Sequence, residues 1–262
     1  MLKKLDRLYA QYNRREYVHP DPLEFLYHYE QIRDREIAGL IASSLAYGKV
    51  AQILISVSRV LDIIGPSPFD YLSSTPERDI FRHFESFVHR FARGENISAL
   101  LIGIKHILGD YGSLYNCFAK GRTASDSTIV PALSFFADTI NSASEKCIPG
   151  HLMPCPEKGS ACKRLNLYLR WMVRCDDVDP GGWNDIPASM LIVPLDVHMF
   201  RISGELGLTR RRQADLKTAL EVTEGFRQWF PSDPVRCDFA LTRFGIRNGA
   251  AGSKALKIKL GI

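Results

Sequence analysis

Several features that assign proteins to a class are missing from this sequence of 262 residues. Its six cysteines form no Cys-x-x-Cys pair, which argues against the common zinc and iron–sulfur sites. No apolar run reaches the roughly 18–20 residues that span a bilayer, and the charged first residues lack the apolar core of a secretory signal. We therefore expect a cytoplasmic protein with reduced thiols, no membrane contact, and no metal or cofactor.

The composition is that of a folded globular protein. Charged residues make up 24% of the chain and apolar residues 45%, proportions that a disordered chain does not have. A chain of this length can bury a full core, as one large domain or as two lobes. The net charge of +5 agrees with a polyanionic partner but does not require one.

No sustained alternation of apolar and polar residues indicates a β-sheet, and the helical signals predict an all-α fold. Asp21 is the expected N-cap of a short helix that starts at Pro22, and Asp34 that of the next helix. The proline-rich residues 149–156 cannot lie inside a helix, and they form the expected main hinge. Further helices are expected over residues 2–15, 50–64, 77–93, 97–109, 126–144 and 163–174, after Asp196, from Thr209 to Phe230, and from Pro234 to about Gly245.

Lys163 stands at the head of an amphipathic helix whose core face includes Leu165, Tyr168 and Met172. The positive end of the helix dipole and partial desolvation beside Leu167 both disfavour a charged amine at this position. A neutral lysine amine can attack a carbon and form a Schiff base. The alternative is a surface lysine whose aliphatic stem covers Leu167.

Asp196 stands at the head of the next strong helix. An aspartate there is a good N-cap, which by itself explains the residue and stabilises a helix by roughly 1 kcal/mol. A carboxylate at this position could also stabilise a developing cation or relay a proton, and the two roles are compatible.

The segment VPLDVHMFRI (193–202) closely resembles the segment after the hairpin in DNA glycosylases of the helix–hairpin–helix superfamily, especially the 8-oxoguanine glycosylases. With KRLNLYLRWMVR (163–174) before it and a longer insertion between, it is most similar to the archaeal type. This resemblance is specific over about 150–206. Nearly all of the chain, including HPDPLEFLYHY and DREIAGLIASSLAYGKV, also resembles an uncharacterised bacterial family related to these enzymes.

The resemblance implies a two-lobed, all-α glycosylase-like unit with a helix–hairpin–helix element. One lobe would cover about 34–145, and the other 1–33 together with 146–248, followed by a tail at 249–262. The implied activity is base-excision repair of an oxidised purine such as 8-oxoguanine, by a monomer acting on damaged duplex DNA.

The resemblance also implies roles for individual residues. Lys163 would match the nucleophile, and Asp196 the carboxylate that stabilises the oxocarbenium-like state and assists proton movement. His198 would match a histidine near a DNA phosphate. After base loss a Schiff base would remain on Lys163, and strand nicking by β-elimination could follow. The base must be flipped out of the helix to reach such a site.

The hairpin departs from the pattern of the superfamily, in which a Gly-x-Gly turn holds a phosphate. Residues 152–160 read LMPCPEKGS, with one glycine and an acidic residue. The amides of Gly159, Ser160 and Ala161 remain candidates for phosphate binding. Lys158, nearer the turn, is a rival to Lys163 as the nucleophile.

The base pocket is less defined. Leu167 occupies the place one turn after the lysine, and Trp171 and Trp183 are candidates to stack on the base, although core packing is the simpler role for both. Tyr47-Gly48-Lys49 stands where related enzymes fill the gap left by the flipped base. The alternative is a helix break with a solvated lysine.

Two charge clusters remain. Arg210, Arg211 and Arg212 appear to head the helix from Thr209, a position that disfavours cations and therefore favours a phosphate partner. The cluster of Asp176, Asp177 and Asp179 is typical of a turn rather than a metal site. Two alternatives to the enzyme stay open, namely a non-catalytic DNA-binding scaffold and an all-α interaction protein.

Overall fold

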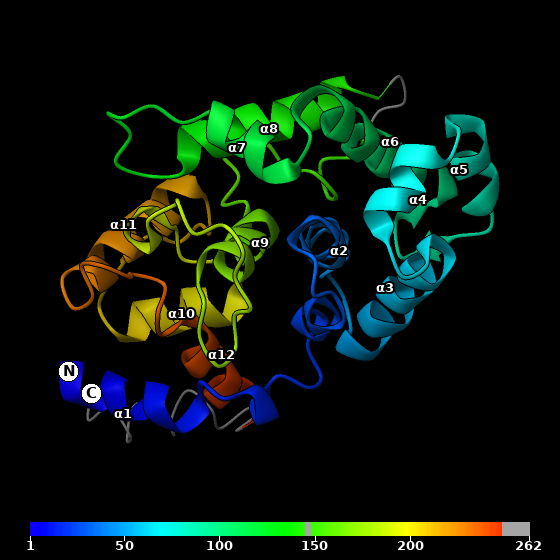
Figure 1. Cartoon of the computed structure of the whole chain (residues 1–262). Coiled ribbons are helices and arrows are strands. Elements are labelled where there is room, and N and C mark those ends of the chain that lie inside the picture. Colours follow the sequence, from blue (N-terminus) through cyan, green and yellow to red (C-terminus); the bar gives the residue numbers. More distant parts are fainter. Residues whose placement is uncertain (145–147, 248–262) are drawn as a thin grey trace. The chain divides into compact units, whose positions relative to one another are not determined.

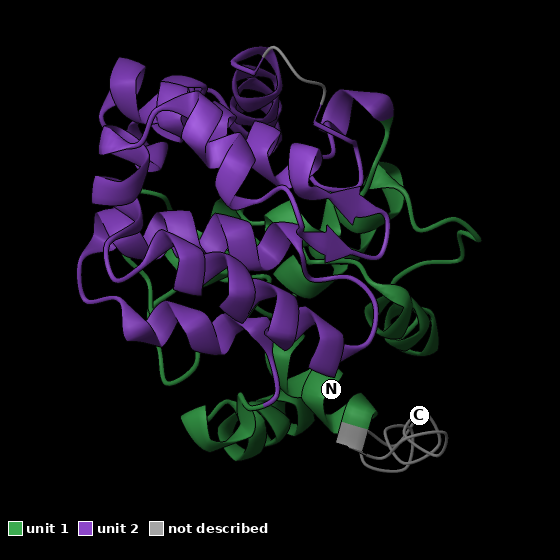
Figure 2. Cartoon of the chain, turned by 90° about the vertical axis from the view of Figure 1, so that its right-hand side faces the viewer, with its two compact units in different colours: residues 1–19, 159–262 green, residues 20–158 purple. Residues whose placement is uncertain are grey.

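The computed structural model describes residues 1–144 and 148–247, and the chain divides into two compact units (Figure 2). Unit 1 comprises Met1–His19 and Gly159–Ile262, and unit 2 comprises Pro20–Lys158. Unit 2 is therefore inserted between the two segments that build unit 1. The expected lobes have the same interlaced order, with boundaries at other residues. The expected tail at 249–262 lies outside the described residues.

Unit 2 is built around the long helix α6, which packs against α4, α5, α7 and α8 (Figure 1). Residues along α6 from Ile97 to Ile104 are buried on every side, as expected for a helix at the centre of a bundle. The elements of unit 2 are η2 (Pro22–His28), α2 (Ile32–Ser44), α3 (Val50–Ile64), α4 (Pro68–Ser74), α5 (Glu77–His83), β1 (Val88–His89), β2 (Ala92–Arg93), α6 (Gly94–Tyr111), α7 (Leu114–Lys120), α8 (Val130–Ser142) and η3 (Pro156–Lys158).

Unit 1 joins its two chain segments through helix packing. The first helix, α1, lies against the last, α12, and α10 also packs on α12. The elements of unit 1 are α1 (Leu2–Tyr12), η1 (Arg15–Tyr17), α9 (Lys163–Val173), η4 (Ala188–Met190), α10 (Val197–Glu205), α11 (Leu216–Arg227) and α12 (Asp238–Arg247).

The described residues are mainly helical, which confirms the all-α prediction at that level. The helix expected over 77–93 is wrong in its second half, because α5 ends at His83 and a two-stranded hairpin follows. The backbone at Gly94 explains the departure. A Cβ there would lie 2.1 Å from the carbonyl oxygen of Phe84, so the chain doubles back on itself at a place where only glycine fits.

Two predicted helix starts behave differently. Asp21 caps η2 as predicted, because its Oδ1 accepts a hydrogen bond from Leu23 N at 3.0 Å. The prediction that Asp34 caps the next helix is wrong, since α2 starts at Ile32. The Asp34 carboxylate instead reaches the start of α4, where it accepts hydrogen bonds from Ser67 Oγ at 3.0 Å and Phe69 N at 2.8 Å.

The two C-terminal helices start later than predicted. α11 begins at Leu216 rather than Thr209, because Asp215 is the N-cap and accepts from Thr218 N at 2.9 Å. The buried Thr209 instead accepts from Arg211 N at 3.1 Å, which turns the chain before the helix. α12 begins at Asp238 rather than Pro234.

Among the described residues, no single helix has the length and apolar composition needed to cross a membrane. The bent pair of α3 and α4, at 57° to each other, meets that requirement only when the two are counted together.

Candidate active site

Lys163 is the first residue of α9, and its side chain is half-buried. The residue before it, Cys162, has a left-handed backbone with φ of 45°. Two hydrogen bonds hold that turn, one from Cys162 N to Ser160 Oγ at 3.1 Å and one from Asn166 Nδ2 to Ala161 O at 2.9 Å. The buried Asn166 thus joins the first turn of α9 to the segment before it, and this contact fixes the backbone position of Lys163.

The rest of α9 is more deeply buried than its sequence predicts. Arg170, Trp171 and Arg174 lie outside the helix face that Leu165, Tyr168 and Met172 mark, but all three are buried as well. The loop after α9 folds back on its end, because Gly181 N donates to Trp171 O at 3.0 Å and Trp183 N to Met172 O at 2.8 Å. The expected amphipathic helix is therefore enclosed along most of its length.

Asp196 is the N-cap of α10, as predicted, and its Oδ1 accepts a hydrogen bond from Met199 N at 2.7 Å. The carboxylate is half-buried, whereas the neighbouring Val197 is 83% exposed. The cap explains the orientation of the side chain, and a chemical role for Asp196 stays a prediction.

The buried Asp238, at the start of α12, connects these two residues. Burial raises the pKa of Asp238 to about 6, and the Arg170 guanidinium beside it acts in the opposite direction. The Asp196 carboxylate raises this pKa further, while the Lys163 ammonium lowers it. The charges of Lys163 and Asp196 therefore both act on the same buried carboxyl of unit 1. Sequence reasoning did not single out Asp238, which it placed inside a helix expected to start at Pro234.

Arg170 and Arg174 form a buried ion-pair network with four aspartates. Arg170 donates to Asp179 Oδ1 at 3.1 Å and also pairs with Asp238. Arg174 spans three carboxylates, those of Asp176 at 2.7 Å, Asp179 at 2.9 Å and Asp233 at 3.0 Å. Because both arginines belong to the helix that Lys163 starts or to its C-cap, the network fixes that helix against α12 and the loop at Asp233.

The aspartate cluster after α9 divides into three roles. Asp176 forms the expected turn, since its Oδ1 accepts from Val178 N at 2.8 Å and Asp179 N at 2.9 Å. Asp179 is fully buried between the two arginines, and burial raises its pKa to about 6. Asp177 is exposed. The sequence here has the composition of a polar turn, so it does not predict that Asp179 is buried.

The segment before α9 is joined through its backbone to the start of α11. Gly159 adopts a left-handed φ of 79°, and its carbonyl accepts from Leu216 N at 3.0 Å. Ser160 forms an isolated antiparallel bridge with Asp215. Lys158, the rival nucleophile, is exposed at the end of η3 in unit 2, not in the unit that holds Asp196.

The base-pocket candidates are placed differently from one another. Leu167 is half-buried one turn after Lys163. Trp171 and Trp183 are each only 1% exposed, and Trp183 packs edge-on against Tyr168 with ring centroids 5.3 Å apart. The packing alternative therefore describes both tryptophans, because rings enclosed in this way are not available for stacking on a base.

The basic DNA-binding candidates of unit 1 differ in their surroundings. His198 is half-buried in the first turn of α10, and Arg210 is exposed. Arg211 donates to Thr218 Oγ1 at 2.7 Å and to Asp215 at 2.6 Å. Since α11 starts only at Leu216, the argument that the arginines face a helix dipole is wrong, and that reason for a phosphate partner is removed.

In unit 2, residues 47–49 form the break between α2 and α3, and a contact of Tyr47 or Lys49 with DNA stays a prediction. Tyr47 is half-buried, and its hydroxyl donates to His89 O at 3.1 Å. Lys49 is exposed and stands immediately before α3. Gly48 between them has φ of 103°, which breaks the path from α2 to α3.

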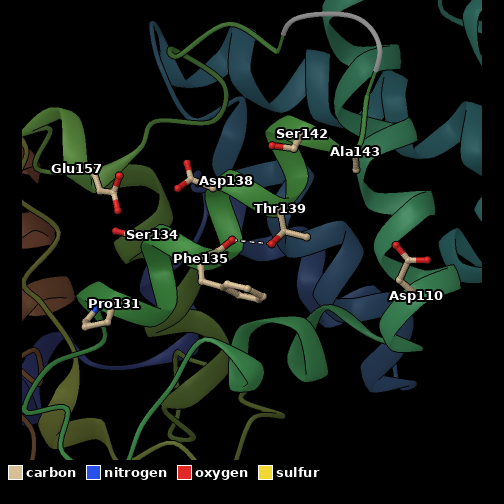
Figure 3. Close-up of a pocket in the computed structure, with 9 residues that line it drawn as sticks. All are labelled: Asp110, Pro131, Ser134, Phe135, Asp138, Thr139, Ser142, Ala143 and Glu157. Carbon is tan, nitrogen blue, oxygen red and sulfur yellow. Dashed lines mark hydrogen bonds between the residues drawn. The ribbon is translucent and has the colours of Figure 1, made fainter.

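A separate hollow in unit 2, lined mainly by α8, contains metal-ligating side chains (Figure 3). The ligand atoms of Asp138, Cys155 and Glu157 lie within 4.8 Å of one another, and the Cys155 thiol donates to Asp138 Oδ1 at 3.3 Å. Burial raises the pKa of that thiol. These three residues could hold a divalent cation. Exposed acidic groups also gather without one, so the expectation of no metal stays a prediction.

Comparison with known proteins gives one match. Residues 21–247 match the family described as "Protein of unknown function (DUF2400)". No curated protein and no solved structure is significantly similar to the chain.

Proposed function

We propose that this chain, which belongs to the DUF2400 family, is a DNA glycosylase with AP-lyase activity that removes an oxidised purine such as 8-oxoguanine. One observation carries the proposal. Lys163 and Asp196 start two helices of unit 1, and the charges of both act on the buried Asp238. An amine that can act as a nucleophile and a carboxylate are the two groups that Schiff-base excision needs.

The chemistry follows from these two groups. The Lys163 ammonium gives up a proton and its amine attacks C1′ of the damaged nucleotide, and the glycosidic bond breaks as the base departs with the bonding electrons and takes up that proton. The Asp196 carboxylate stabilises the positive charge that develops on the sugar. The sugar ring then opens as the C1′–O4′ bond breaks and a proton moves from the Lys163 nitrogen to O4′, which leaves an iminium on Lys163. Loss of a proton from C2′ then expels the 3′ phosphate, and hydrolysis of the iminium releases Lys163.

Asp196 can serve both as cap and as catalyst. Its Oδ1 accepts the hydrogen bond from Met199 N, which fixes the carboxylate at the start of α10. A carboxylate that is held by the backbone in this way needs no reorganisation when charge develops on the substrate.

The arginine–aspartate network supplies positioning in this proposal. Arg170 lies seven residues after Lys163 on the same helix and pairs with Asp238 and Asp179. A shift of about 1 Å in a reacting group can cost on the order of a hundredfold in rate. A helix held at several charged contacts limits such shifts of Lys163.

The proposal is tested by borohydride trapping on duplex DNA that carries a single 8-oxoguanine, with an abasic duplex beside it. We expect a covalent adduct from the wild type and none from Lys163→Gln. Lys158→Gln is the matched control, and it should trap like the wild type. An adduct that survives Lys163→Gln and disappears with Lys158→Gln would assign the nucleophile to the rival lysine. An adduct on the abasic duplex alone would keep the lyase activity and leave the base unidentified.

The non-catalytic DNA-binding scaffold is the second candidate, and specific observations favour it. The hairpin segment carries a single glycine, and the two candidate stacking tryptophans are buried. This alternative predicts DNA binding that weakens steeply with salt, and no adduct on either duplex. A protein that only binds other proteins would show no DNA affinity even at about 50 mM salt.

A further inference from the structure

The hairpin of unit 2 presents an aromatic ring to solvent. β1 and β2 pair in antiparallel register, with Val88 opposite Arg93 and His89 opposite Ala92, so Arg90 and Phe91 form the two-residue tip. Phe91 is 70% exposed, although the residues around it in the strands alternate between buried and exposed. An exposed phenylalanine at a hairpin tip adds nothing to the core of its own unit.

The backbone of this tip is in an unfavourable conformation for its sequence. Arg90 has a φ of 53°, in the left-handed region that glycine and asparagine usually occupy. Gly48, with φ of 103°, makes room for the Arg90 side chain, because a Cβ on Gly48 would lie 2.8 Å from Arg90 Cδ. Residues in such conformations persist where the surrounding structure holds them, and they gather at functional sites.

The base of the hairpin is held from below. His89 is 1% exposed, and its ring nitrogens contact Ser56 Oγ at 2.8 Å and Tyr47 O at 3.1 Å. Tyr47 in turn donates to His89 O at 3.1 Å, and the two rings lie edge-on with centroids 4.6 Å apart. An exposed ring is thus mounted on a buried, hydrogen-bonded support, so that Phe91 loses little freedom when it binds a partner.

Exposed cations lie on the hairpin and next to Gly48, which contacts Arg90. Arg90, Arg93 and Lys49 are all exposed, and the Arg90 guanidinium lies 5.4 Å from the centre of the Phe91 ring. Within the described part of the chain, none of these three side chains forms an ion pair. The hairpin and Lys49 therefore combine two exposed apolar side chains, Phe91 and the 47% exposed Val88, with three uncompensated positive charges.

We infer that this hairpin tip is a DNA-binding wedge, in which Phe91 enters the base stack while Arg90, Arg93 and Lys49 contact phosphates. Aromatic rings stack on bases of any sequence, and phenylalanine wedges are known to enter base steps. The three uncompensated charges suit a polyanion, and the exposed ring suits the bases that a nucleic acid offers for stacking. The role of filling a gap opened by a flipped base rests on the proposed function. DNA binding by the tip does not.

Phe91, rather than Tyr47, is then the residue of unit 2 that fills the gap left by a flipped base. Tyr47 was the expected filler, but its hydroxyl is used to hold His89. Tyr47 is instead a positioning residue that supports the tip, and Phe91 is the residue that would touch the DNA. Lys49 keeps its predicted contact with DNA, now as one of three exposed cations on or beside the hairpin.

The test measures binding of labelled duplexes, one with 8-oxoguanine and one undamaged, by fluorescence anisotropy across a salt series. We expect Phe91→Ala to weaken binding about tenfold with an unchanged salt slope, because stacking carries no charge. Arg90→Gln should reduce the slope by about one. Phe91→Trp should restore binding. Ile55→Ala is the matched control, since Ile55 is 62% exposed in the same unit, and it should bind like the wild type.

A second readout reports the wedge directly. A duplex with 2-aminopurine beside the lesion should brighten on binding of the wild type and brighten less with Phe91→Ala. Wild-type affinity in Phe91→Ala, with its unfolding midpoint unchanged, would overturn the inference while leaving trapping on Lys163 intact. Weakened binding without any trapped adduct in the wild type would keep the wedge and reject the glycosylase. No DNA binding by the wild type, or binding to anionic lipid vesicles instead, would overturn the wedge.

Discussion

The two units bury their carboxylates against different partners. In unit 2, Glu36 accepts from Leu114 N at 2.7 Å and Tyr115 N at 3.1 Å, at the start of α7. In unit 1, the buried Asp179 and Asp238 pair with guanidinium groups instead. The first arrangement satisfies backbone donors that every helix start leaves unpaired. The second brings several full charges out of water.

The buried carboxylates of the two units therefore serve different purposes. A carboxylate on a helix N-terminus also benefits from the helix dipole, so it contributes to the architecture directly. A buried ion pair recovers its desolvation cost only with good geometry, and an apolar replacement is often as stable. The network of unit 1 is therefore poorly explained by stability alone. Its contacts to the helix that Lys163 starts explain it better, as a means of fixing position.

Three variants sharpen this comparison, in order of their expected effect on the free energy of unfolding. The largest effect is expected for Asp238→Ala in unit 1. Arg170 would lose one of its two partners inside the core, and we expect a loss of about 3 kcal/mol. Urea unfolding followed by tryptophan fluorescence measures it.

Asp177→Ala is the control for that measurement. Asp177 is exposed, and its removal should change the free energy of unfolding by less than about 0.5 kcal/mol. A loss as small in Asp238→Ala as in this control would show that the network fixes nothing.

Glu36→Ala in unit 2 should have a smaller effect. Two backbone N–H groups at the start of α7 lose their acceptor, which we expect to cost about 2 kcal/mol. Because Glu36 lies in unit 2 and Lys163 and Asp196 lie in unit 1, the yield of trapped adduct per folded molecule should stay at the wild-type level. Loss of trapping in a well-folded Glu36→Ala protein would contradict the view that Glu36 supports only the fold of unit 2.

Asp196→Asn should have the smallest effect on stability and a large effect on chemistry. Asparagine caps helices about as well as aspartate, so unfolding should change by less than about 0.5 kcal/mol. The negative charge is lost, and we expect the single-turnover rate of adduct formation to fall by about a hundredfold. Asp196→Ala separates the roles, because it should lose the cap as well. A normal rate in Asp196→Asn would leave the residue as a cap only.

Local signals in the sequence predicted the elements that such signals control. Gly65 ends α3 where expected, Asp196 caps α10, and α9 starts at Lys163. The failures are at residues whose partners lie far along the chain. Asp34 looks like a local cap, yet it caps α4, a helix more than thirty residues later. Nothing near it in the sequence announces that partner.

The same limit applies to the candidate site. Lys163 and Asp196 were found through a resemblance and helix-start patterns, but Asp238 was missed because its partner Arg170 is 68 residues away. The exposed Phe91 was missed for another reason. Its tip contains no glycine or asparagine to mark a turn, so the segment read as the end of a helix.

The order of the elements along the chain determines which of the two units can complete its fold first during synthesis. α1 packs on α12, but the ribosome makes α1 first, then all of unit 2, and only later α12. Unit 2 can fold during synthesis, whereas unit 1 cannot close until its final helix emerges. At about 5–20 residues per second, α1 waits for at least roughly ten seconds with Leu5 and Leu8 uncovered. The unit that holds Lys163 is therefore the later of the two to complete its fold.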